Sequence, residues 1–440
     1  MKVIADFNRV TGKIKPMHGV GQAPIIGTKS SPFDYLGEAG IPYSRLHDVG
    51  GPFGGFRFVD IPNIFRDFNA DETLPESYDF TFTDWLITKL MEQKCEPFFR
   101  LGVTIENDYE MKAYRIFPPK DFEKWARICE HIIRHYNEGW ADGFHYNITY
   151  WEIWNEPDNE MMWLGTAEEY YRLYEVTSKH LKKCFGDSIR VGGYASCGFS
   201  QWLKDPNCEG IPDAIPDTKE YWIEFAHGFL RYISSDEHKS PLDFFSWHSY
   251  GQVYKAIEKS KYCRRMLEKY GFDDVEEIIN EWNPTPDKIL RSTPMAAARA
   301  LAMMLGLQKT RVDQMEYYDA RIGASVYGGM FNPDTWEPYL TYYAFKSFNE
   351  AYKLQNEVLT ETDDEHVFVG GATNGEKAVL LLANLHEEPV EAEFELNGVS
   401  IENLEILMID SAHSYVQAEK KIQNGKLILP EHSCIEIRFQ

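Results

Sequence analysis

Two segments of the chain contain the same dipeptide, Asn-Glu, and proline follows each pair closely. The first reads Tyr-Trp-Glu-Ile-Trp-Asn-Glu-Pro at 150–157, and the second reads Glu-Ile-Ile-Asn-Glu-Trp-Asn-Pro at 277–284. Both place a glutamate, Glu156 or Glu281, where an apolar strand turns into a loop. Two carboxylates about 5–5.5 Å apart suit the cleavage of a glycosidic bond, because one can act as nucleophile and the other as general acid and then base. Such closeness also separates their pKa values, since one ionised carboxylate holds a proton on its neighbour.

Eight strand-like runs between about residues 17 and 354 frame these two motifs. Each run is followed by a loop and then by a helical pattern, and the runs are continuously apolar or aromatic, as expected for strands covered on both faces. Strands that alternate with helices pair in parallel, and eight such units close into a (β/α)8 TIM barrel, an α/β fold. The expected strands are Met17–Val20, Ile41–Leu46, Pro97–Leu101, Ile148–Trp154, Ile189–Tyr194, Phe244–Trp247, Glu277–Asn280 and Gln314–Tyr318.

The two glutamates fall at the ends of the fourth and seventh of these strands. In a barrel, those ends lie roughly opposite each other at the C-terminal mouth, where catalytic groups collect. We therefore expect Glu156 and Glu281 to face each other across a cleft. The plainer alternative is that each glutamate ends a strand and binds a surface cation. That alternative would be preferred for a single Asn-Glu pair, but two pairs at barrel-compatible positions make it unfavourable.

The helices between the strands have recognisable ends. Thr166, with glutamate three residues later, has the spacing of a capping box and opens a long helix that Gly186 ends. Thr293, with proline directly after it, is an N-cap before a helix at 295–309. The segment 336–354 is expected to form the eighth helix of the barrel.

The pattern of the chain changes after about residue 355. Strand-like runs there are separated by Asn-Gly pairs, which favour tight hairpins. These runs predict a small antiparallel β-sandwich, which the strand-like N-terminus is expected to join. We therefore expect a catalytic barrel at 16–354 and an accessory β-sandwich formed by 1–15 and 355–440. The expected accessory strands are 2–7, 12–15, 366–369, 378–384, 390–396, 405–409 and 435–439.

The composition restricts the partners of the protein. The 440 residues include 45 Lys and Arg against 69 Asp and Glu, which gives a formal net charge of −24. This charge argues against nucleic acid, whose phosphates need clustered Lys and Arg, and against an anionic membrane surface. No run of about 18 apolar residues is present in the sequence to span a bilayer. A neutral ligand such as a sugar is compatible with the charge, and an oligosaccharide is the partner that we expect.

The cysteines and the N-terminus bear on the cellular compartment. The seven cysteines are odd in number and scattered, without a Cys-x-x-Cys motif, which is typical of reduced thiols rather than of a disulfide framework. Residues 1–6 meet a charge too early for the apolar stretch of a signal peptide. We expect a cytoplasmic protein, or a periplasmic or extracellular one if a leader was removed.

The motifs resemble signatures of the clan A glycoside hydrolases. Trp-Asn-Glu-Pro at 154–157 and Asn-Glu-Trp at 280–282 are similar to the clan signatures on strands 4 and 7. Within the clan, the chain looks most like glycoside hydrolase family 39, the family of β-xylosidases and α-L-iduronidases. The likeness covers the barrel well and the sheet domain loosely. It extends through Arg-Leu-His-Asp at 45–48, the segment 151–157 with Trp163 after it, Trp-His-Ser-Tyr at 247–250 and the segment 279–282.

The resemblance implies a role for each matching residue. Glu156 would be the acid/base and Glu281 the nucleophile, while Asn155 would bond the sugar 2-hydroxyl. Arg45 and Tyr250 would lie beside the nucleophile and hold it ionised and oriented. General chemistry agrees, because a guanidinium lowers the pKa of a nearby carboxyl group and a phenol can donate a hydrogen bond to it. A plainer alternative for Arg45 is an ion pair inside the barrel.

Further residues would bind the sugar itself. The resemblance implies contacts of His47, Asp48 and His248 with sugar hydroxyls, and the alternative for His248 is a core histidine with satisfied hydrogen bonds. Most aromatic side chains are expected to fill the core, but some at the mouth would stack on sugar faces. The candidates for stacking are Trp154, Trp163, Trp202 and Trp282.

The chain departs from the β-xylosidase pattern at the eighth strand. That pattern has a tryptophan there, followed by an acidic pair that grips the xylose, whereas this chain has Tyr318 and no acidic doublet at the expected place. Asp319, Tyr327 and Trp336 are candidates for an altered sugar-binding surface, with ordinary loop packing as the alternative. The departure leaves the expected catalytic chemistry in place and opens the question of which sugar is bound.

The sequence therefore predicts a retaining, exo-acting glycosidase for plant-type oligosaccharides that needs no metal or organic cofactor. β-D-Xylose is the leading sugar, with α-L-arabinofuranose and β-D-galactose as alternatives. A non-catalytic carbohydrate-binding barrel and a transglycosylase on the same scaffold are the other classes, and the fold alone does not separate them. Because members of the resembled family often form oligomers, a homo-oligomer is expected on that ground.

Overall fold

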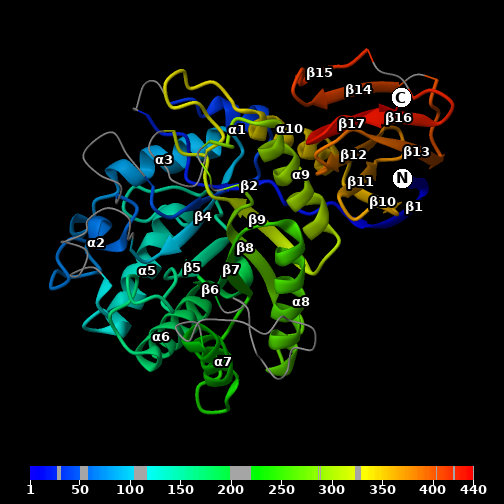
Figure 1. The fold of residues 1–440 in the computed structure, drawn as a ribbon. Helices are drawn as coiled ribbons and strands as arrows, with labels where there is room; N and C mark the ends of the chain where they lie inside the picture. Colours follow the sequence, from blue (N-terminus) through cyan, green and yellow to red (C-terminus); the bar gives the residue numbers. More distant parts are fainter. Residues whose placement is uncertain are drawn as a thin grey trace.

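The computed structural model describes residues 1–26, 31–49, 58–103, 116–198, 220–285, 287, 289–322, 329–402, 404–419 and 422–439. Its larger part is a closed barrel of eight parallel strands with helices around it (Figure 1). Each of the eight strands overlaps a predicted run, so the TIM-barrel prediction is confirmed. The barrel strands are β2 Gly19–Gly21, β3 Tyr43–Leu46, β4 Glu96–Leu101, β5 Tyr150–Ile153, β6 Arg190–Ser196, β7 Phe244–Tyr250, β8 Glu276–Asn283 and β9 Val312–Tyr317.

Helices connect the strands and cover the barrel. The predicted capping box opens α6 (Ala167–Phe185), where the Glu169 N–H donates to the Thr166 side chain and the Glu169 side chain accepts from the Thr166 N–H. Thr293 caps α9 (Pro294–Gln308) as predicted. The other described helices are α1 Asp34–Glu38, α2 Ile61–Ile64, α3 Thr81–Glu92, α5 Phe122–Asn137, α7 Glu220–Ser234, α8 Val253–Lys269 and α10 Leu340–Leu354, with the 3-10 turns η1 Pro75–Ser77 and η2 Gly186–Ser188.

The eighth helix begins later than the sequence predicts. Helix α10 starts at Leu340 instead of Trp336, because the residues before it are held in a turn. The Asn332 side chain accepts two backbone N–H bonds from residues that follow it, and Trp336 has a φ of +64°, which a right-handed helix does not allow. Pro338 then disfavours helical geometry at the residue before it.

In the described part of the chain, nine further strands lie outside the barrel: β1 Lys2–Lys13, β10 Asn356–Thr362, β11 Val367–Thr373, β12 Ala378–Asn384, β13 Val390–Asn397, β14 Leu404–Ile409, β15 Ser414–Gln417, β16 Lys426–Leu429 and β17 Ser433–Phe439. They form one sheet in the order β15-β14-β17-β12-β11-β10-β1-β13-β16. The N-terminal strand β1 lies inside this sheet, antiparallel to β10 and parallel to β13. The sequence did not predict β10, β15 or β16, and it divided β1 into two pieces at its exposed polar middle.

The sheet curls over itself into a sandwich. Phe7 of β1 and Phe439 of β17 have ring centroids 5.3 Å apart, although three strands separate β1 from β17 in the hydrogen-bonded order. Neighbouring strands lie about 4.8 Å apart, so a flat sheet would keep these two rings far from each other. Side chains from both halves of the sheet share one apolar core. The predicted sandwich is therefore a single continuous sheet that contains one parallel pair of strands.

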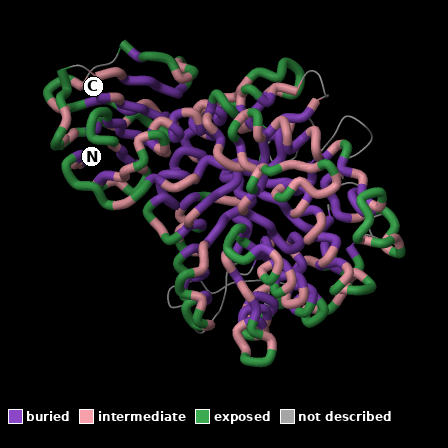
Figure 2. The backbone as a smooth tube through the Cα atoms, turned by 180° about the vertical axis from the view of Figure 1, so that it is seen from behind, coloured by how far each residue is buried: buried purple, intermediate pink, exposed green. Residues whose placement is uncertain are grey.

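Helices α9 and α10 join the barrel to the sheet (Figure 1). Most residues of α9 are buried, because the helix contacts its neighbours around the barrel and also β11, β12 and β17. Gln308 at the end of α9 ties the two parts together: its side chain accepts the Lys15 N–H and donates to Glu357. Figure 2 shows the buried backbone gathered in the centre of the barrel and along the inner strands of the sheet.

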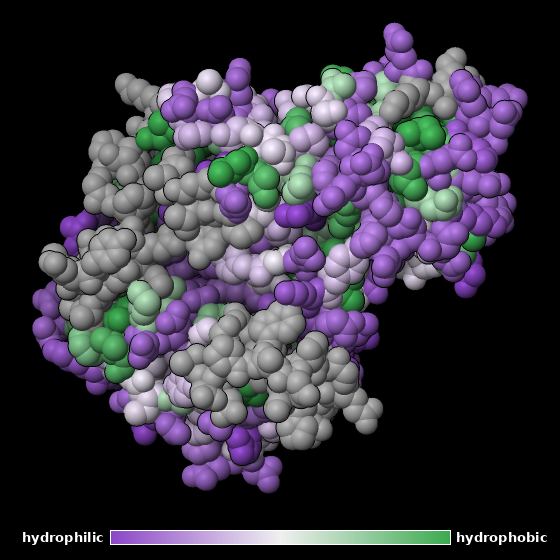
Figure 3. All heavy atoms as spheres, in the orientation of Figure 1, coloured by the Kyte–Doolittle hydropathy of each residue, from purple (hydrophilic) through white to green (hydrophobic). Residues whose placement is uncertain are grey.

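The surface agrees with the acidic composition. The face shown in Figure 3 is mainly hydrophilic, and apolar residues appear on it as separate patches. Among the described residues, no helix combines the length and the apolar character needed to cross a membrane.

Candidate active site

Glu281 lies near the end of β8, at the mouth of the barrel, and two neighbours hold its carboxylate. Arg45 Nη1 donates to Oε1 at 2.8 Å, and the Tyr250 hydroxyl donates to Oε2 at 2.7 Å. Arg45 comes from β3, and Tyr250 ends β7, the strand that pairs with β8. Burial raises the pKa of Glu281, while the charge of Arg45 and the hydrogen bond of Tyr250 act against this rise. The two contacts thus orient the carboxylate and favour its ionised form.

A second glutamate, Glu152 of β5, holds the other side of Arg45. Arg45 Nε and Nη2 donate to Glu152 Oε2 at 2.9 and 2.6 Å. The Ser246 hydroxyl donates to Glu152 Oε1 at 2.5 Å, and the Asn280 amide donates to the same oxygen. Both Arg45 and Glu152 are fully buried, so the guanidinium is fixed between two carboxylates. Contacts inside the barrel therefore fix the orientation of the Arg45 guanidinium toward Glu281.

Sequence reasoning missed Glu152, although the signal was present. Successive residues of a strand alternate between its faces, so Glu152 points to the same side as Tyr150. The Tyr150 hydroxyl donates to Glu276 of β8, which places that side inside the barrel. A charged residue in the middle of an apolar strand is almost never buried without a partner. Glu152 could have been proposed on that basis as a counter-charge for Arg45.

Glu156 lies on the turn that follows β5. Trp154 and Glu156 have positive φ angles of 72° and 45°, and the Glu156 N–H donates to the Ala195 carbonyl at 3.2 Å. Positive φ is uncommon in residues with a side chain, so the surroundings hold this turn in place. The Glu156 side chain is 13% exposed, against 7% for Glu281. The turn brings the more exposed carboxylate next to the more buried one.

His248 of β7 lies between the two glutamates. Its Nδ1 is 2.5 Å from Glu156 Oε1 and 3.4 Å from Glu281 Oε2. One polar atom from each of these three residues lies within 4.8 Å of the other two, so the carboxylates meet at close range as the sequence predicts. Burial lowers the pKa of His248 to about 4, and its imidazole is therefore neutral at ordinary pH.

Two carboxylates and an imidazole are also donor types that can hold a metal ion. In this cluster, however, Arg45 already places a positive charge on Glu281 at 2.8 Å. His248 Nδ1 lies within hydrogen-bonding distance of Glu156 Oε1. The arrangement therefore fits acid–base and nucleophilic chemistry carried by the side chains themselves.

A chain of polar side chains leads from the end of β9 to the cluster. Gln22 Nε2 donates to the Tyr318 hydroxyl, and that hydroxyl donates to Asp48 Oδ2, each at 3.0 Å. Asp48 Oδ2 is 3.3 Å from His47 Nε2, which in turn is 3.7 Å from Glu281 Oε1. Burial lowers the pKa of His47 well below its ordinary value, so this imidazole is neutral too. Three predicted residues are thus connected to the nucleophile candidate, and Gln22 is an addition that no sequence motif indicated.

Asn155 and Asp319 have different relations to this network. Arg45 Nη2 donates to Asn155 Oδ1 at 2.6 Å, and the Asn155 amide nitrogen faces Met162 Sδ at 3.8 Å. Asp319 is buried and accepts from Arg321 Nη2 at 3.2 Å. Asn155 is therefore joined directly to Arg45, whereas Asp319 forms an ion pair with a neighbour in the chain.

The tryptophans expected to stack on sugar lie mostly inside the protein. Trp154 and Trp163 pack edge to face with ring centroids 5.1 Å apart, and Trp282 stacks on Phe345 at 5.8 Å. All three are buried, so they support the ends of β5 and β8 from within. Trp336, on the loop before α10, is 38% exposed, and its contact with sugar stays a prediction. Two further candidates lie outside the described residues: Trp202 and Tyr327.

Asp158 is a titratable group beside the cluster that sequence reasoning missed. The Ser196 hydroxyl donates to its Oδ2 at 2.7 Å, and the Cys197 N–H donates to its Oδ1 at 3.3 Å. Burial, together with the charge of Glu156, raises the pKa of Asp158 to about 7. An aspartate after Glu-Pro gives no spacing signal, and its burial became visible only in the folded chain.

The barrel and the close pair of carboxylates place the chain among TIM-barrel proteins with an acidic site at the C-terminal mouth. The family model of glycosyl hydrolases family 39 matches residues 41–298, a stretch that contains Arg45, Glu156 and Glu281. The chain belongs to glycosyl hydrolases family 39.

Curated relatives share part of the sequence. A beta-xylosidase from Geobacillus stearothermophilus is 25% identical over 257 residues, which cover 54% of this chain and 44% of the relative. A beta-xylosidase from Caldicellulosiruptor saccharolyticus is 28% identical over 263 residues, which cover 57% of this chain and 47% of the relative. The chain thus matches less than half the length of these relatives.

Solved structures share the fold over the whole chain. A glucosidase from Croceicoccus marinus has a TM-score of 0.77 at 19% identity, covering 100% of this chain and 98% of that one. A monomeric beta-xylosidase from Caulobacter crescentus has a TM-score of 0.68 at 16% identity, covering 100% and 99%. At these identities the likeness shows the fold, with its barrel and its sheet domain.

Proposed function

We propose that this chain is a retaining glycosidase that removes a terminal sugar, β-D-xylose in the first place, from plant-type oligosaccharides. The observation that carries the proposal is the glutamate pair, whose oxygens and His248 Nδ1 lie within 4.8 Å of one another. Retaining enzymes place their two carboxyl groups about 5–5.5 Å apart, whereas inverting enzymes leave about 6.5–9.5 Å for a water molecule. The close approach of Glu156 and Glu281 supports the retaining arrangement.

The unequal surroundings of the two glutamates support an assignment of roles. Glu281, oriented by Arg45 and Tyr250, attacks the anomeric carbon and forms a glycosyl ester, while Glu156 gives its proton to the departing oxygen. Water then attacks the same carbon, Glu156 takes the water proton, and Glu281 leaves as a carboxylate. The neutral His248 lies with its Nδ1 2.5 Å from Glu156 Oε1, within hydrogen-bonding distance of this acid/base.

The identity of the sugar rests on weaker support. The curated relatives that match this chain are beta-xylosidases, which favours xylose. The hydrogen-bonded group of Tyr318, Asp48 and His47 lies beside Glu281, which supports a role of these residues in binding sugar hydroxyls. Because Tyr318 stands where the β-xylosidase pattern has tryptophan, α-L-arabinofuranosides and β-galactosides are the alternative substrates.

The first experiment is a panel of nitrophenyl glycosides: β-xyloside, α-L-arabinofuranoside, β-galactoside and β-glucoside. We expect the β-xyloside to be cleaved fastest, and NMR of the first-formed xylose should show the β anomer. An α anomer formed first would contradict the retaining mechanism. Absence of turnover on every glycoside and on xylo-oligosaccharides would contradict the assignment as a glycosidase.

The second experiment traps the intermediate. A 2-deoxy-2-fluoro xyloside with a good leaving group should add one fluoroxylosyl unit to the protein, because the fluorine slows both steps and the good leaving group restores the rate of the first step only. Peptide mass spectrometry should place this unit on Glu281. Labelling of Glu156 instead would reverse the two assigned roles. Turnover of the ordinary nitrophenyl β-xyloside in the presence of an alcohol acceptor distinguishes a hydrolase from a transglycosylase, since the latter yields the alkyl xyloside as main product.

A further inference from the structure

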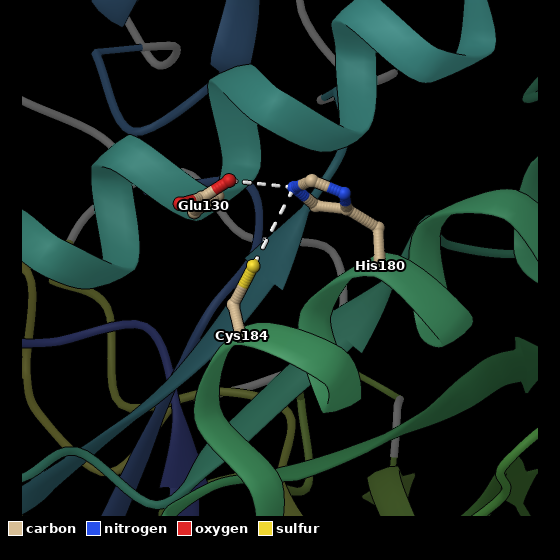
Figure 4. A group of neighbouring side chains, drawn as sticks. All are labelled: Glu130, His180 and Cys184. Atoms are coloured by element: carbon tan, nitrogen blue, oxygen red, sulfur yellow. Dashed lines mark hydrogen bonds and ion pairs between the residues drawn. The ribbon is translucent and has the colours of Figure 1, made fainter.

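Two helices on the outside of the barrel, α5 and α6, bring together three side chains of metal-binding type (Figure 4). His180 and Cys184 lie one helical turn apart on α6, a spacing that places both on the same face of the helix. Glu130 reaches this face from α5. His180 Nε2 is 2.6 Å from Glu130 Oε2 and 3.8 Å from Cys184 Sγ. One ligand atom of each residue lies within 4.8 Å of the other two.

We propose that Glu130, His180 and Cys184 form a binding site for a divalent metal ion of the zinc class. Zinc binds cysteine sulfur at about 2.3 Å, imidazole nitrogen at about 2.0–2.1 Å and carboxylate oxygen at about 2.0–2.2 Å, most often with four ligands around it. Those bond lengths put sulfur and nitrogen about 3.5 Å apart in a tetrahedral site, close to the observed 3.8 Å. Glu130 and His180 are at hydrogen-bonding distance and need to separate by less than about 1 Å. Water fills the fourth position.

The charges around the three ligands fit this occupant. When the ion binds, the Cys184 thiol releases its proton to water, and the resulting thiolate and the Glu130 carboxylate together carry the two negative charges that match a divalent cation. Arg134 Nε donates to Glu130 Oε1 at 2.8 Å, which orients the carboxylate and leaves its other oxygen toward His180. The positive charge of Arg134 is balanced in turn by Glu138, with which it forms an ion pair. Arg134 thus acts as a support for the ligand Glu130.

The place of the cluster allows an ion to enter from solvent. The side chains of His180 and Glu130 are 28% and 14% exposed, and Cys184 is half-buried. The ligands come from two helices that pack against each other, so a bound ion would cross-link α5 and α6 on the flank of the barrel. Such a link stabilises the folded state, because the ion binds the native chain and the unfolded chain holds no preformed site.

The proposed metal site has a sulfur donor that the catalytic cluster lacks, and an absorption spectrum can detect this donor. The group of Glu156, His248 and Glu281 contains no sulfur, whereas Cys184 supplies a thiolate. Co²⁺ replaces zinc in such sites and shows a sulfur-to-metal charge-transfer band in the near ultraviolet only when a thiolate is bound. The band therefore reports the outer site even when an ion also enters the active site.

The test uses the full chain without a histidine tag, reduced and freed of metal with a chelator. We expect titration with Co²⁺ to produce the charge-transfer band with one equivalent of ion, Zn²⁺ to displace the cobalt, and added Zn²⁺ to raise the melting temperature. Cys184→Ser should abolish the band. His180→Ala and His180→Gln should weaken Co²⁺ binding by at least about tenfold, since each removes a ligand.

Two matched variants separate a specific site from general binding. His238→Ala removes another half-buried histidine that pairs with a glutamate, Glu175, at 3.1 Å, without a thiol ligand in that pair. Glu281→Gln alters the catalytic cluster. Both should keep the cobalt band and its affinity. A wild-type chain without the band and without a Zn²⁺-dependent rise in melting temperature would overturn the proposal, and so would undiminished affinity in both His180 variants.

Discussion

Strand β8 carries two buried glutamates near opposite ends of the barrel, and their surroundings differ. Glu281 at the mouth accepts hydrogen bonds from Arg45 at 2.8 Å and from Tyr250 at 2.7 Å. Glu277 near the other end accepts one from Trp247 Nε1 at 3.2 Å and lies 3.9 Å from Arg264. Burial raises the pKa of Glu277 to about 8, so this residue is a neutral acid at pH 7.

The comparison shows that burial raises the pKa of Glu277 to about 8 although a guanidinium lies 3.9 Å away, whereas the carboxylate that we propose as nucleophile has a guanidinium at 2.8 Å. Arg264 gives hydrogen bonds to the backbone carbonyls of Asp273 and Val275. Arg45 gives its hydrogen bonds to side chains, among them the carboxylates of Glu152 and Glu281. The direction of one guanidinium, more than the depth of burial, distinguishes the two ends of β8.

The largest expected effect comes from removing the carboxylate at the mouth. Glu281→Ala should lower kcat by at least about 10⁴-fold, because residues that form the covalent intermediate act as a unit with the rest of the site. Glu277→Gln, the matched change on the same strand, should leave kcat within about threefold, since it replaces a neutral acid by a neutral amide. Initial rates on nitrophenyl β-xyloside measure both, and circular dichroism checks the fold. Comparable losses of kcat in the two variants would contradict the functional difference that we assign to the two ends of β8.

The next effect concerns the more exposed partner at the mouth. Glu156→Ala should lower kcat/KM by about 10²–10⁴-fold on xylosides with poor leaving groups, because proton donation is then required to break the bond. With dinitrophenyl xyloside the loss in the first step should be small. Asn159→Ala, which removes the neighbour that donates to Glu156 at 3.4 Å, should show no such dependence on the leaving group. A loss in Glu156→Ala that is equal for all leaving groups would contradict its role as the acid.

Because Glu277 is a neutral acid, its replacement by glutamine should change the pH dependence of protein stability. Between the ordinary pKa of 4.5 and the native pKa of about 8, the folded chain keeps the Glu277 proton and the unfolded chain releases it. The wild type therefore loses stability from this group as pH rises through that window, whereas Glu277→Gln does not. The stability of the variant relative to wild type should increase by about 2–3 kcal/mol from pH 5 to pH 7. Urea unfolding at the two pH values measures it, and a pH-independent difference would show that Glu277 is ionised in the native state.

The smallest expected effect concerns Tyr250, which makes the second contact to Glu281. Tyr250→Phe removes a hydrogen bond that lowers the pKa of Glu281, so that pKa rises. Because the nucleophile must be ionised, the acid limb of kcat/KM should move to higher pH, and kcat should fall about tenfold, the equivalent of about 1.5 kcal/mol for a hydrogen bond to a charged group. Tyr254→Phe, which removes a hydroxyl that donates to the Glu365 carbonyl, should leave the pH profile unchanged. An acid limb that moves to lower pH in Tyr250→Phe would contradict the assigned contact.

Several features of this molecule could be predicted from residue types and spacing. The eight barrel strands, the capping box at Thr166 and the proline after Thr293 follow from local patterns, and the structure contains them. The meeting of Glu156 and Glu281 followed from their places at the ends of strands in a barrel, since the fold brings those ends together.

Other features depend on contacts between distant segments and have no local pattern. Glu152 and Gln22 belong to the site through hydrogen bonds that cross the barrel. Trp154 and Trp282 were expected to face sugar, but an aromatic residue beside a catalytic motif has the same local pattern whether it points to solvent or into the core. The late start of α10 could not be predicted either, because it depends on the turn that Asn332 stabilises.

The N-terminal strand β1 has a consequence for the order in which the chain folds. Lys2 pairs with Glu393 of β13 and Val3 pairs with Thr362 of β10, so the barrel segment is inserted between two parts of one sheet. During synthesis β1 leaves the ribosome before any of its partners, and its edges stay unpaired until those strands exist. Pairing between such distant segments is intrinsically slow. The sheet therefore closes only after the whole barrel segment has been made, and its closure joins the two ends of that segment.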